Sequence, residues 1–464
     1  MTDLTSDIRE ALRRDGPESA SALARRLGVS TPTVTRALSK LGDAIVTIGK
    51  GRSSRCALYR EVRDLGHAWP LYRIDRDGRP ELLGRIEALH GRYRWRLVPE
   101  HPLPLFMRGG FEEGLYEDLP WFLQALRPQG YLGRESARFF ADDIGAPQDI
   151  SRWQADDILS GLLHFGVDLT GNLLLQHGLA QQNPTSILEQ DPAAYDPHNM
   201  RSYLYPIYAD ESDQLDQPGS SAAGEQPKFI TTLTHDDGGI SSVIVKFAPL
   251  DAGNPTAQRW ADLLICEEIA LRLLAAHGVA AARSEILDAG EWRFLQSTRF
   301  DRTSQGGRIG VFALDALDMA YVGSDQRDWL AGAEPLHKQG MIDTDDLERI
   351  RLLHAFGRLI GNNDMHHGNL SFYAEPQHAA LRLAPLYDML PMHYRPAVSG
   401  LVRETPFELP PPDLSHQTIW AQAATLAEAF WTTAAGDTRL SEAFAGLCAD
   451  NRLRVSQWKA QHHL

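Results

Sequence analysis

The sequence has very few cysteines. Only Cys56, Cys266 and Cys448 occur among 464 residues, and none belongs to a Cys-x-x-Cys pair. This spacing indicates neither a disulfide framework nor a thiolate zinc site. Long apolar runs are also missing. No stretch approaches the roughly 18 residues that a membrane-spanning helix needs, and the N-terminus lacks the apolar core of a signal peptide. We therefore expect a cytoplasmic protein with reduced thiols.

The chain as a whole is short of positive charge, with a formal net charge of −15 at pH 7. This balance argues against a protein that wraps nucleic acid over its whole surface. The charge is uneven, however. Residues 1–60 contain 11 Lys and Arg against 6 Asp and Glu, so they carry +5 and the remainder carries −20. A basic head on an acidic body indicates that only the head meets phosphate.

Two short amphipathic segments joined by a tight turn form the centre of the head. In "ESASALARRLGVSTPTVTRALSKLG" (18–42), apolar residues recur at helical spacing, Gly28 permits a left-handed corner and Ser30 can cap the second helix. The following "AIVTIGKGRSSRCALYRE" (44–61) reads as two strands around a glycine-rich basic turn. This pattern predicts a winged helix-turn-helix over residues 1–62.

Hydroxyl and cationic side chains on the second helix and the wing are candidates for DNA contact, because they can reach base edges and phosphates. The candidates are Thr31, Thr33, Thr35, Arg36 and Lys40 on the helix, with Lys50, Arg52 and Arg55 on the wing. Small three-helix units of this kind also serve as protein–protein modules. The clustering of cations on the helix and the wing favours DNA.

The middle of the chain contains fewer candidate functional residues. Residues 67–100 alternate like the strands of a small β module, and residues 115–180 have more helical periodicity. The stretch "DESDQLDQPGSSAAGEQPK" (210–228) is rich in helix and strand breakers, so we expect a polar loop there.

A strand and a helix beyond this loop place two charged residues in unusual settings. Lys246 lies in "SSVIVKF" (241–247), a β-branched run typical of a strand, where a lysine is commonly at the surface. In the helix predicted over 258–278, Glu267 falls within the apolar stripe and needs a buried partner, while Glu268 faces solvent. Protein kinases use such a helix glutamate to orient the strand lysine that grips nucleotide phosphates.

The stretch "GNNDMHHGNL" (361–370) follows a predicted helix that begins with Thr344 as its cap and stops at Gly361. Asp364 and Asn369 are five residues apart, as in the kinase catalytic loop, where the aspartate accepts the substrate proton and the asparagine holds Mg²⁺. Asp388 ends a later apolar strand and could complete the magnesium site with a hard oxygen ligand. Each of these sequence features alone is common in proteins, so the interpretation as a kinase site depends on their order along the chain.

Five segments in this order resemble the motifs of HipA-family serine/threonine kinases, the toxins of bacterial toxin–antitoxin pairs. They are "SAAGEQPKF" (221–229), "VIVKFAP" (243–249), "STRFDR" (297–302), "GNNDMHHGN" (361–369) and "LAPLYDMLP" (383–391). Because the head has its own helix-turn-helix, the chain most resembles the YjjJ-type members. The resemblance implies an α+β fold, with a two-lobed HipA/protein-kinase-like body behind the winged helix-turn-helix. Its N-terminal lobe would span 63–300, with the β module and the phosphate loop. A mostly helical C-terminal lobe would span 301–464.

The resemblance also implies roles for individual residues. Asp364 would be the catalytic base, Lys246 would bind phosphates and His366 would assist the transition state, while Asn369 and Asp388 would bind Mg²⁺. We expect His367, the neighbour of His366, to face solvent. The residues expected around ATP are Ser221, Ala222, Ala223, Gly224, Gln226 and Lys228 of the phosphate loop, together with Lys246, Glu267, Ser297 and Phe300. Ser221 matches the serine that family members phosphorylate on themselves.

Two departures from the family stand out. Many relatives carry a lysine just before the loop asparagine, where this chain has Gly368. Typical HipA toxins also depend on a separate DNA-binding antitoxin, whereas here the DNA-binding unit is fused, so the need for an antitoxin stays open. The resemblance implies a protein substrate from the translation machinery, such as an aminoacyl-tRNA synthetase, and DNA as the partner of residues 1–62.

Two alternatives remain at this stage. A metal hydrolase could use Asp364, His366 and His367, although adjacent histidines in an extended loop point to opposite sides. A catalytically weak or inactive body could instead sense nucleotide and control transcription through the winged helix. The chain has every catalytic position, with Gly368 as the unusual one.

Overall fold

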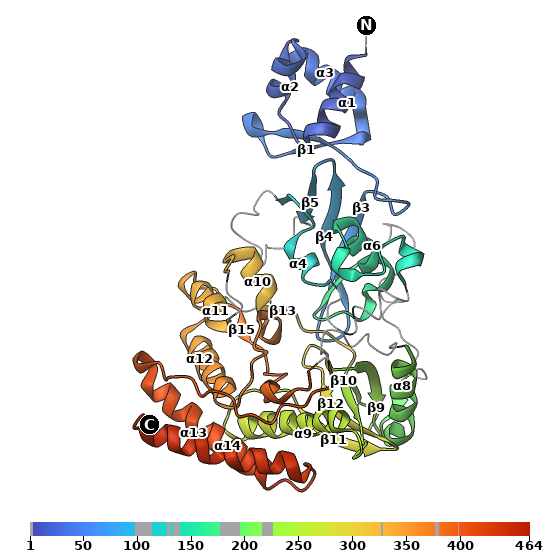
Figure 1. Ribbon diagram of the computed structural model, residues 1–464. Helices are drawn as coiled ribbons and strands as arrows, with labels where there is room; N and C mark the ends of the chain where they lie inside the picture. The colour runs from blue at the N-terminus through green and yellow to red at the C-terminus, as the bar shows by residue number, and fades with distance from the viewer. Residues whose placement is uncertain are drawn as a thin grey trace. The chain divides into compact units, whose positions relative to one another are not determined.

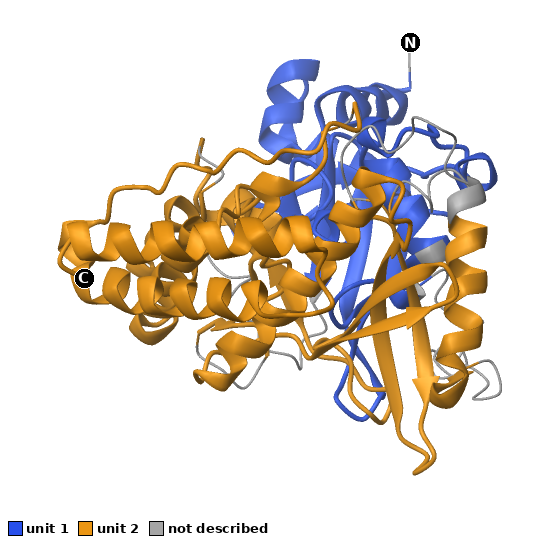
Figure 2. Ribbon diagram, turned by 60° about the horizontal axis from the view of Figure 1, so that its bottom comes forward, with its two compact units in different colours: residues 1–128, 136–189 blue, residues 129–135, 190–464 orange. Residues whose placement is uncertain are grey.

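The computed structural model describes residues 3–97, 114–127, 131, 133, 140–176, 195–215, 226–325, 328–375, 380–397 and 399–464. The chain forms two compact units: unit 1 comprises residues 1–128 and 136–189, and unit 2 comprises residues 129–135 and 190–464 (Figure 2). This division does not follow the boundaries expected at residues 62 and 300, since the β module lies with the head in unit 1. Within the described ranges, no helix is long and apolar enough to cross a membrane.

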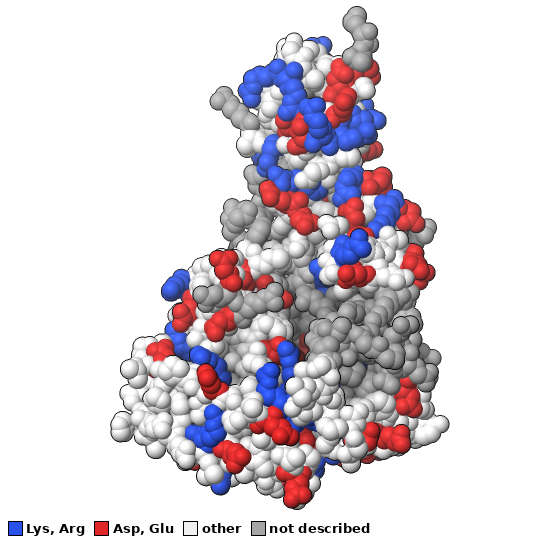
Figure 3. All heavy atoms as spheres, viewed as in Figure 1, with Lys and Arg blue, Asp and Glu red and all other residues white. Residues whose placement is uncertain are grey.

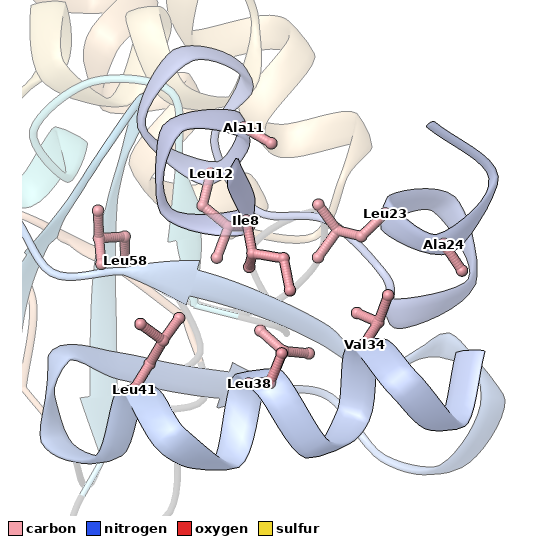
Figure 4. Close-up of a cluster of buried hydrophobic side chains, with 10 residues drawn as sticks. Ile8, Ala11, Leu12, Leu23, Ala24, Val34, Leu38, Leu41 and Leu58 are labelled. Atoms are coloured by element: carbon pink, nitrogen blue, oxygen red, sulfur yellow. The ribbon is translucent and has the colours of Figure 1, made fainter. Parts of the chain in front are cut away.

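Unit 1 begins with a winged helix-turn-helix. Helices α1 (Leu4–Asp15), α2 (Ala20–Leu27) and α3 (Thr31–Leu41) precede the antiparallel strands β1 (Ile45–Ile48) and β2 (Arg55–Leu58). The turn after α2 is left-handed at Gly28, with φ of 67°. Figure 4 shows the core of this head, in which aliphatic side chains from all three helices and from β2 meet. Helix α1 was not predicted, although Ile8, Ala11 and Leu12 provide its buried face.

The rest of unit 1 is built on a five-stranded antiparallel sheet (Figure 1). Its strand order is β6 (Leu115–Tyr116), β5 (Arg92–Leu97), β4 (Pro80–Leu89), β3 (Ala68–Ile74) and β7 (Leu173–Leu175). The helices beside it are α4 (Trp121–Gln124) and α6 (Ala155–Phe165). The ring of Phe122 lies 5.0 Å from that of Trp95 and packs α4 on one face of the sheet.

Unit 2 begins with a second five-stranded sheet, which lies between two helices. Its strand order is β11 (Ser284–Ala289), β12 (Trp292–Thr298), β10 (Ile240–Pro249), β9 (Lys228–Thr234) and β8 (Asp196–Pro197). Val243, Val245 and Phe247 of β10 pack with helix α8 (Arg201–Leu215). Ala248 packs on the other face with helix α9 (Pro255–Ala276). Helix α8 includes residues 210–215, so the prediction of a loop over 210–228 placed the start of that loop too early.

The remainder of unit 2 is mainly helical. Helices α10 (Leu314–Tyr321), α11 (Trp329–Lys338) and α12 (Thr344–Leu359) are followed by α13 (Gln417–Ala435) and α14 (Glu442–Gln461). A small antiparallel sheet of β13 (Val311–Ala313), β14 (Ser371–Tyr373) and β15 (Arg382–Leu383) lies beside them. The cap of α12 is Asp343, whose side chain accepts from the Asp346 amide, so the expected cap at Thr344 was one residue too late.

Candidate active site

Lys246 lies at the centre of a buried ion cluster in unit 2. Because side chains alternate along β10, Lys246 points to the α9 side of the sheet, where Glu267 occupies the middle of that helix. The Lys246 ammonium donates to both carboxylate oxygens of Glu267 at 2.7 Å and also to Oδ1 of Asp388. The Glu267 side chain is only 1% exposed. One cation therefore binds two carboxylates that come from different elements.

The charges of this cluster follow from burial and from mutual contact. Burial acts to lower the pKa of Lys246, but Asp388 and Glu267 outweigh it and the pKa is raised. Burial raises the pKa of Glu267 despite the neighbouring ammonium. Burial also acts to raise the pKa of Asp388, but Lys246 and Lys228 outweigh it and lower the pKa to about 2. When all three groups are ionised, the cluster carries one excess negative charge, which favours a cation beside it.

The backbone of Asp388 has an uncommon conformation that its surroundings hold in place. Its φ is 54°, in the left-handed region that aspartate adopts more readily than most residues. The Asp388 amide donates to Oε1 of Glu267 at 3.3 Å, and its carbonyl accepts from the Asn362 side chain at 3.4 Å. The segment is thus fixed to α9 on one side and to the loop after α12 on the other.

The loop from Gly361 to Asn369 is closed by its own asparagine side chains. Asn362 Oδ1 accepts from the Asp364 amide at 3.1 Å, and Asn369 Nδ2 donates to the Asp364 carbonyl at 2.8 Å. These bonds position Asp364, whose side chain is 39% exposed with Nη1 of Arg395 at 4.0 Å from Oδ1. Asn362 and Arg395 were not among the predicted site residues. The pair of asparagines before Asp364 was the available signal for Asn362.

The two histidines of the loop have different surroundings. His366 is exposed and its Nδ1 accepts from the Gly368 amide at 3.0 Å. His367 is buried, with Nε2 at 2.8 Å from the Asp328 carbonyl and Nδ1 at 3.8 Å from Oδ2 of Asp318. The interpretation of these two side chains as joint ligands of one ion therefore has no geometric support.

Gly368 and His366 are sterically coupled. A Cβ at position 368 would lie 2.9 Å from Cε1 and Nδ1 of the His366 ring, closer than real Cβ contacts. A glycine thus allows the imidazole to fold back over the loop. Glycine therefore has a steric role at position 368, the one position where the loop departs from the HipA-family pattern.

We expect Gly368→Ala to displace the His366 ring and to lower any phosphoryl-transfer rate about 10- to 100-fold, because small misplacements near reacting groups are costly. In a His366→Ala background, Gly368→Ala should lower the phosphoryl-transfer rate by less than about twofold, because the clash with the imidazole is gone. Rates of the single and double variants test this, and their unfolding temperatures provide a second readout. Independent, additive effects would contradict the coupling.

An aromatic group connects Ser297 and Phe300, two of the residues expected around ATP, with this loop. Ser297 lies in β12 opposite Ile244 of β10, and the Phe300 ring that follows is 5.8 Å from the ring of Tyr387. The Tyr387 hydroxyl donates to the Gly368 carbonyl at 2.8 Å. Tyr387 was not predicted as a site residue, although it directly precedes Asp388.

The predicted phosphate loop falls partly outside the described residues. Ser221, Ala222, Ala223 and Gly224 lie outside them. Gln226 is buried, and its Nε2 has no hydrogen-bond partner among the described residues. Lys228 begins β9 directly opposite Lys246 in the β9–β10 register. A buried amide donor without a partner and two lysines at one strand end are suited to an anionic ligand such as a nucleotide phosphate.

The donor set also suits a magnesium ion. Asn369 uses its amide nitrogen on the Asp364 carbonyl, which leaves the amide oxygen for a cation, and Asp388 contributes a carboxylate of low pKa. Both are hard oxygen donors of the kind Mg²⁺ prefers. No cluster of three or more His, Cys, Asp or Glu side chains suited to a metal occurs in the described part of the chain. Magnesium commonly binds through one or two carboxylates plus substrate phosphates, so such a cluster is not required.

Two further expectations from the sequence are wrong. His367 is buried rather than facing solvent. Glu268 is buried as well. Its carboxylate accepts hydrogen bonds from Arg272 at 2.7 Å and from Arg439 of the α13–α14 connection at 2.9 Å. The pair Glu267 and Glu268 thus binds cations on both sides of α9.

The predicted DNA-contacting residues lie on α3 and on the wing of unit 1. Thr31, Thr35, Arg36 and Lys40 are exposed on α3, and Lys50 is exposed at the start of the wing turn. On the face shown in Figure 3, Lys and Arg side chains gather over this head.

The remaining three candidates have other surroundings. The Thr33 hydroxyl lies 2.7 Å from that of the capping residue Ser30, so Thr33 supports the helix start. Arg55 is half-buried, and strand alternation places it on the same side of β2 as Ala57. The side chain of Arg52 lies outside the described residues.

The fold and the site together define a HipA-like protein with a winged helix-turn-helix. Family models match in three parts: "Winged helix-turn-helix DNA-binding" over residues 1–44, "YjjJ-like toxin, middle domain" over 65–183 and "HipA-like C-terminal domain" over 220–448. The HipA of Shewanella oneidensis MR-1, solved with HipB and its operator DNA, matches with a TM-score of 0.55 at 14% identity, covering 83% of this chain and 95% of that one.

Sequence comparison narrows this class further. The chain is 34% identical to the toxin YjjJ of Escherichia coli K12 over 459 residues, covering 98% of both chains. The chain therefore belongs to the YjjJ toxins, a group with a HipA-like C-terminal domain. A proinflammatory kinase of Helicobacter pylori, CtkA, has a TM-score of only 0.34 at 10% identity, covering 50% of this chain and 92% of that one, and the likeness is too slight to support an inference.

Proposed function

We propose that the chain is an ATP- and Mg²⁺-dependent serine/threonine protein kinase whose active site lies in unit 2. The observation that carries this proposal is the Lys246–Glu267–Asp388 cluster, in which a strand lysine is bonded to a helix glutamate and to the carboxylate that follows a short strand. This is the arrangement with which kinases hold nucleotide phosphates and metal. Asp364 and Asn369, fixed within one loop of the same unit, supply the remaining groups.

Each residue would contribute through position and charge. Lys246, held by Glu267, would bind the phosphates of ATP. Asp364 would orient the hydroxyl of the substrate serine or threonine and take up its proton as the oxygen attacks the terminal phosphorus. Asn369 and Asp388 would hold Mg²⁺, which would neutralise phosphate charge when bound. Gln226 and Lys228 would bind the phosphates from the β9 side, and Ser297 and Phe300 would frame the base.

Charge at the transferring phosphoryl group needs a source other than the lysine that relatives carry at position 368. We assign this charge to His366, which lies in the same loop, or to Arg395, which lies near Asp364. His366 contacts the Gly368 amide, and Arg395 lies 4.0 Å from Asp364. Either group would act electrostatically.

Two kinds of partner follow from this proposal. The protein substrate would be a component of translation, such as an aminoacyl-tRNA synthetase, and Ser221 would be modified by the chain itself. The winged helix-turn-helix would bind DNA. The HipA relative was solved with HipB and operator DNA. In the present chain the head would supply the DNA contact, with or without a separate antitoxin.

Gly368 supports a second candidate function, in which the body senses nucleotide without efficient transfer and the head controls transcription. Mass-spectrometric mapping after incubation with ATP and Mg²⁺ distinguishes the two. A kinase should acquire a phosphoryl group at Ser221 that disappears in Ser221→Ala and persists in the adjacent control Ser220→Ala. An unmodified protein whose DNA binding changes with ATP would instead support the regulator.

A further inference from the structure

Four arginines of unit 1 lie on the face of its sheet that is opposite to the aromatic core, and one of them, Arg92, is paired with Glu117 at 2.9 Å. In the β4–β5 register Arg85 pairs with Arg96 and Glu87 pairs with Arg94, so all four side chains share one face. The intervening Trp95 points to the other face and packs with Phe122 of α4. We call the set of Arg85, Arg94 and Arg96 the arginine face.

The arginine face carries an excess of positive charge. Its central carboxylate, Glu87, is buried and lies 3.0 Å from Arg96 and 3.6 Å from Arg94. Arg85 takes part in none of the ion pairs found in the described residues. Three guanidinium groups therefore meet one carboxylate. Arg85 and Arg96 stand directly opposite each other, an arrangement of like charges that costs stability unless an anion lies between them.

The wing of the helix-turn-helix is hydrogen-bonded to the same sheet. The Arg60 amide donates to the Ala88 carbonyl and the His90 amide donates to the Leu58 carbonyl, both at 3.0 Å. Ile48 and Ala57 of the wing strands pack on Leu89, which shares a face with Glu87. The hydroxyl of Tyr59 then reaches Oε1 of Glu87 at 3.3 Å. The wing strands and the arginine face thus form one continuous structure.

The positive charge of the head also continues along the sequence into this sheet. Residues 63–97 contain eight arginines against five Asp and Glu, a net of +3. Residues 1–97 together carry +7, which leaves −22 for the rest of the chain. The basic part of the molecule therefore ends with β5 and not with the wing.

We propose that the arginine face is a second phosphate-binding surface, which holds DNA that the winged helix-turn-helix has bound. Guanidinium groups suit phosphate oxygens, and a polyanion would relieve the repulsion between Arg85 and Arg96. Because the arginine face is continuous with the wing, we assign duplex DNA as its partner and not another anion. The inference rests on the proposed DNA binding by the head and gives the middle domain a role in it.

The salt dependence of DNA affinity tests this proposal on the full chain. The probe is a fluorescein-labelled duplex DNA of arbitrary sequence, titrated by anisotropy at several NaCl concentrations. Each phosphate contact contributes about 0.9 to the slope of log K against log salt. We expect Arg85→Ala/Arg96→Ala to reduce the slope by about 1.8 and to weaken binding several-fold at low salt. Arg85→Ala alone, which breaks no ion pair within the described part of the chain, should reduce the slope by about 0.9.

A matched control separates local contact from net charge. Arg79→Ala/Arg382→Ala removes the same charge from the β3–β4 turn and from β15, and should leave the slope unchanged. A wild-type slope in the Arg85→Ala/Arg96→Ala variant would contradict DNA contact by the arginine face, but it would not contradict the proposed DNA binding by the head. Absence of duplex binding by the wild type would overturn both proposals. A slope change seen with RNA of equal length and not with DNA would also overturn the assignment.

Discussion

Replacing Asp364 with alanine should lower the rate of phosphoryl transfer from ATP by about 10² to 10⁴-fold, the usual contribution of a general base. ATP affinity should change little, because Asp364 lies in the loop after α12 while Lys246, Glu267 and Asp388 form a separate cluster. The rate is measured as label transferred from ATP to protein, and affinity is measured by equilibrium binding. A split between rate and affinity is the signature of a residue that acts in the chemical step.

The matched control for this prediction is Asn363→Ala. Asn363 is exposed and adjacent to Asp364, so its removal should leave the rate within about twofold, as for most surface substitutions. If Asp364→Ala retained the wild-type rate, Asp364 would not be the base. An equal loss in both variants would indicate general damage to the loop.

Lys246→Met should abolish tight ATP binding and destabilise unit 2 by about 3–5 kcal/mol, because it leaves buried carboxylates without their cation. The stability of this variant should depend on pH. Burial already raises the pKa of Glu267, and loss of the ammonium raises it further. A carboxyl with a raised folded pKa loses stability as pH rises from its unfolded value through its folded value. Denaturant midpoints should therefore be higher at pH 5 than at pH 8.

Two further variants test the cause of this loss. Lys246→Met/Glu267→Met should be more stable than Lys246→Met alone, since no buried carboxylate of α9 then lacks a partner. Lys338→Met removes a lysine from the exposed end of α11 and should leave both stability and ATP binding unchanged. A Lys246→Met variant with wild-type stability and no dependence on pH would contradict the ion-cluster account.

Features that depend on local sequence were predictable. The apolar spacing in α2 and α3 and the left-handed Gly28 indicated the helix-turn-helix, and the family model that matches residues 1–44 confirms that assignment. The position of Glu267 in an apolar stripe indicated a buried partner, which the structure identifies as Lys246 only 21 residues away. Periodicity within one element carries this information because burial selects its pattern.

Features that depend on distant contacts were not predictable in the same way. Asp388 bonds to Lys246 from 142 residues away, and Arg439 pairs with Glu268 from 171 residues away. No local pattern reports such a partner, so Glu268 was placed in solvent. His367 was misplaced for the same reason, because its partners belong to α10 and to the residue before α11. The roles of the site residues themselves stay predictions.

Intact-mass spectrometry of the wild-type chain tests the central claim most directly. The protein is incubated with Mg²⁺ and either ATP or an analogue whose terminal phosphoryl group cannot be transferred, and binding of both nucleotides is verified separately. The kinase account predicts a mass gain of one phosphoryl group with ATP and no gain with the analogue. An unchanged mass with ATP, although ATP binds, would contradict it.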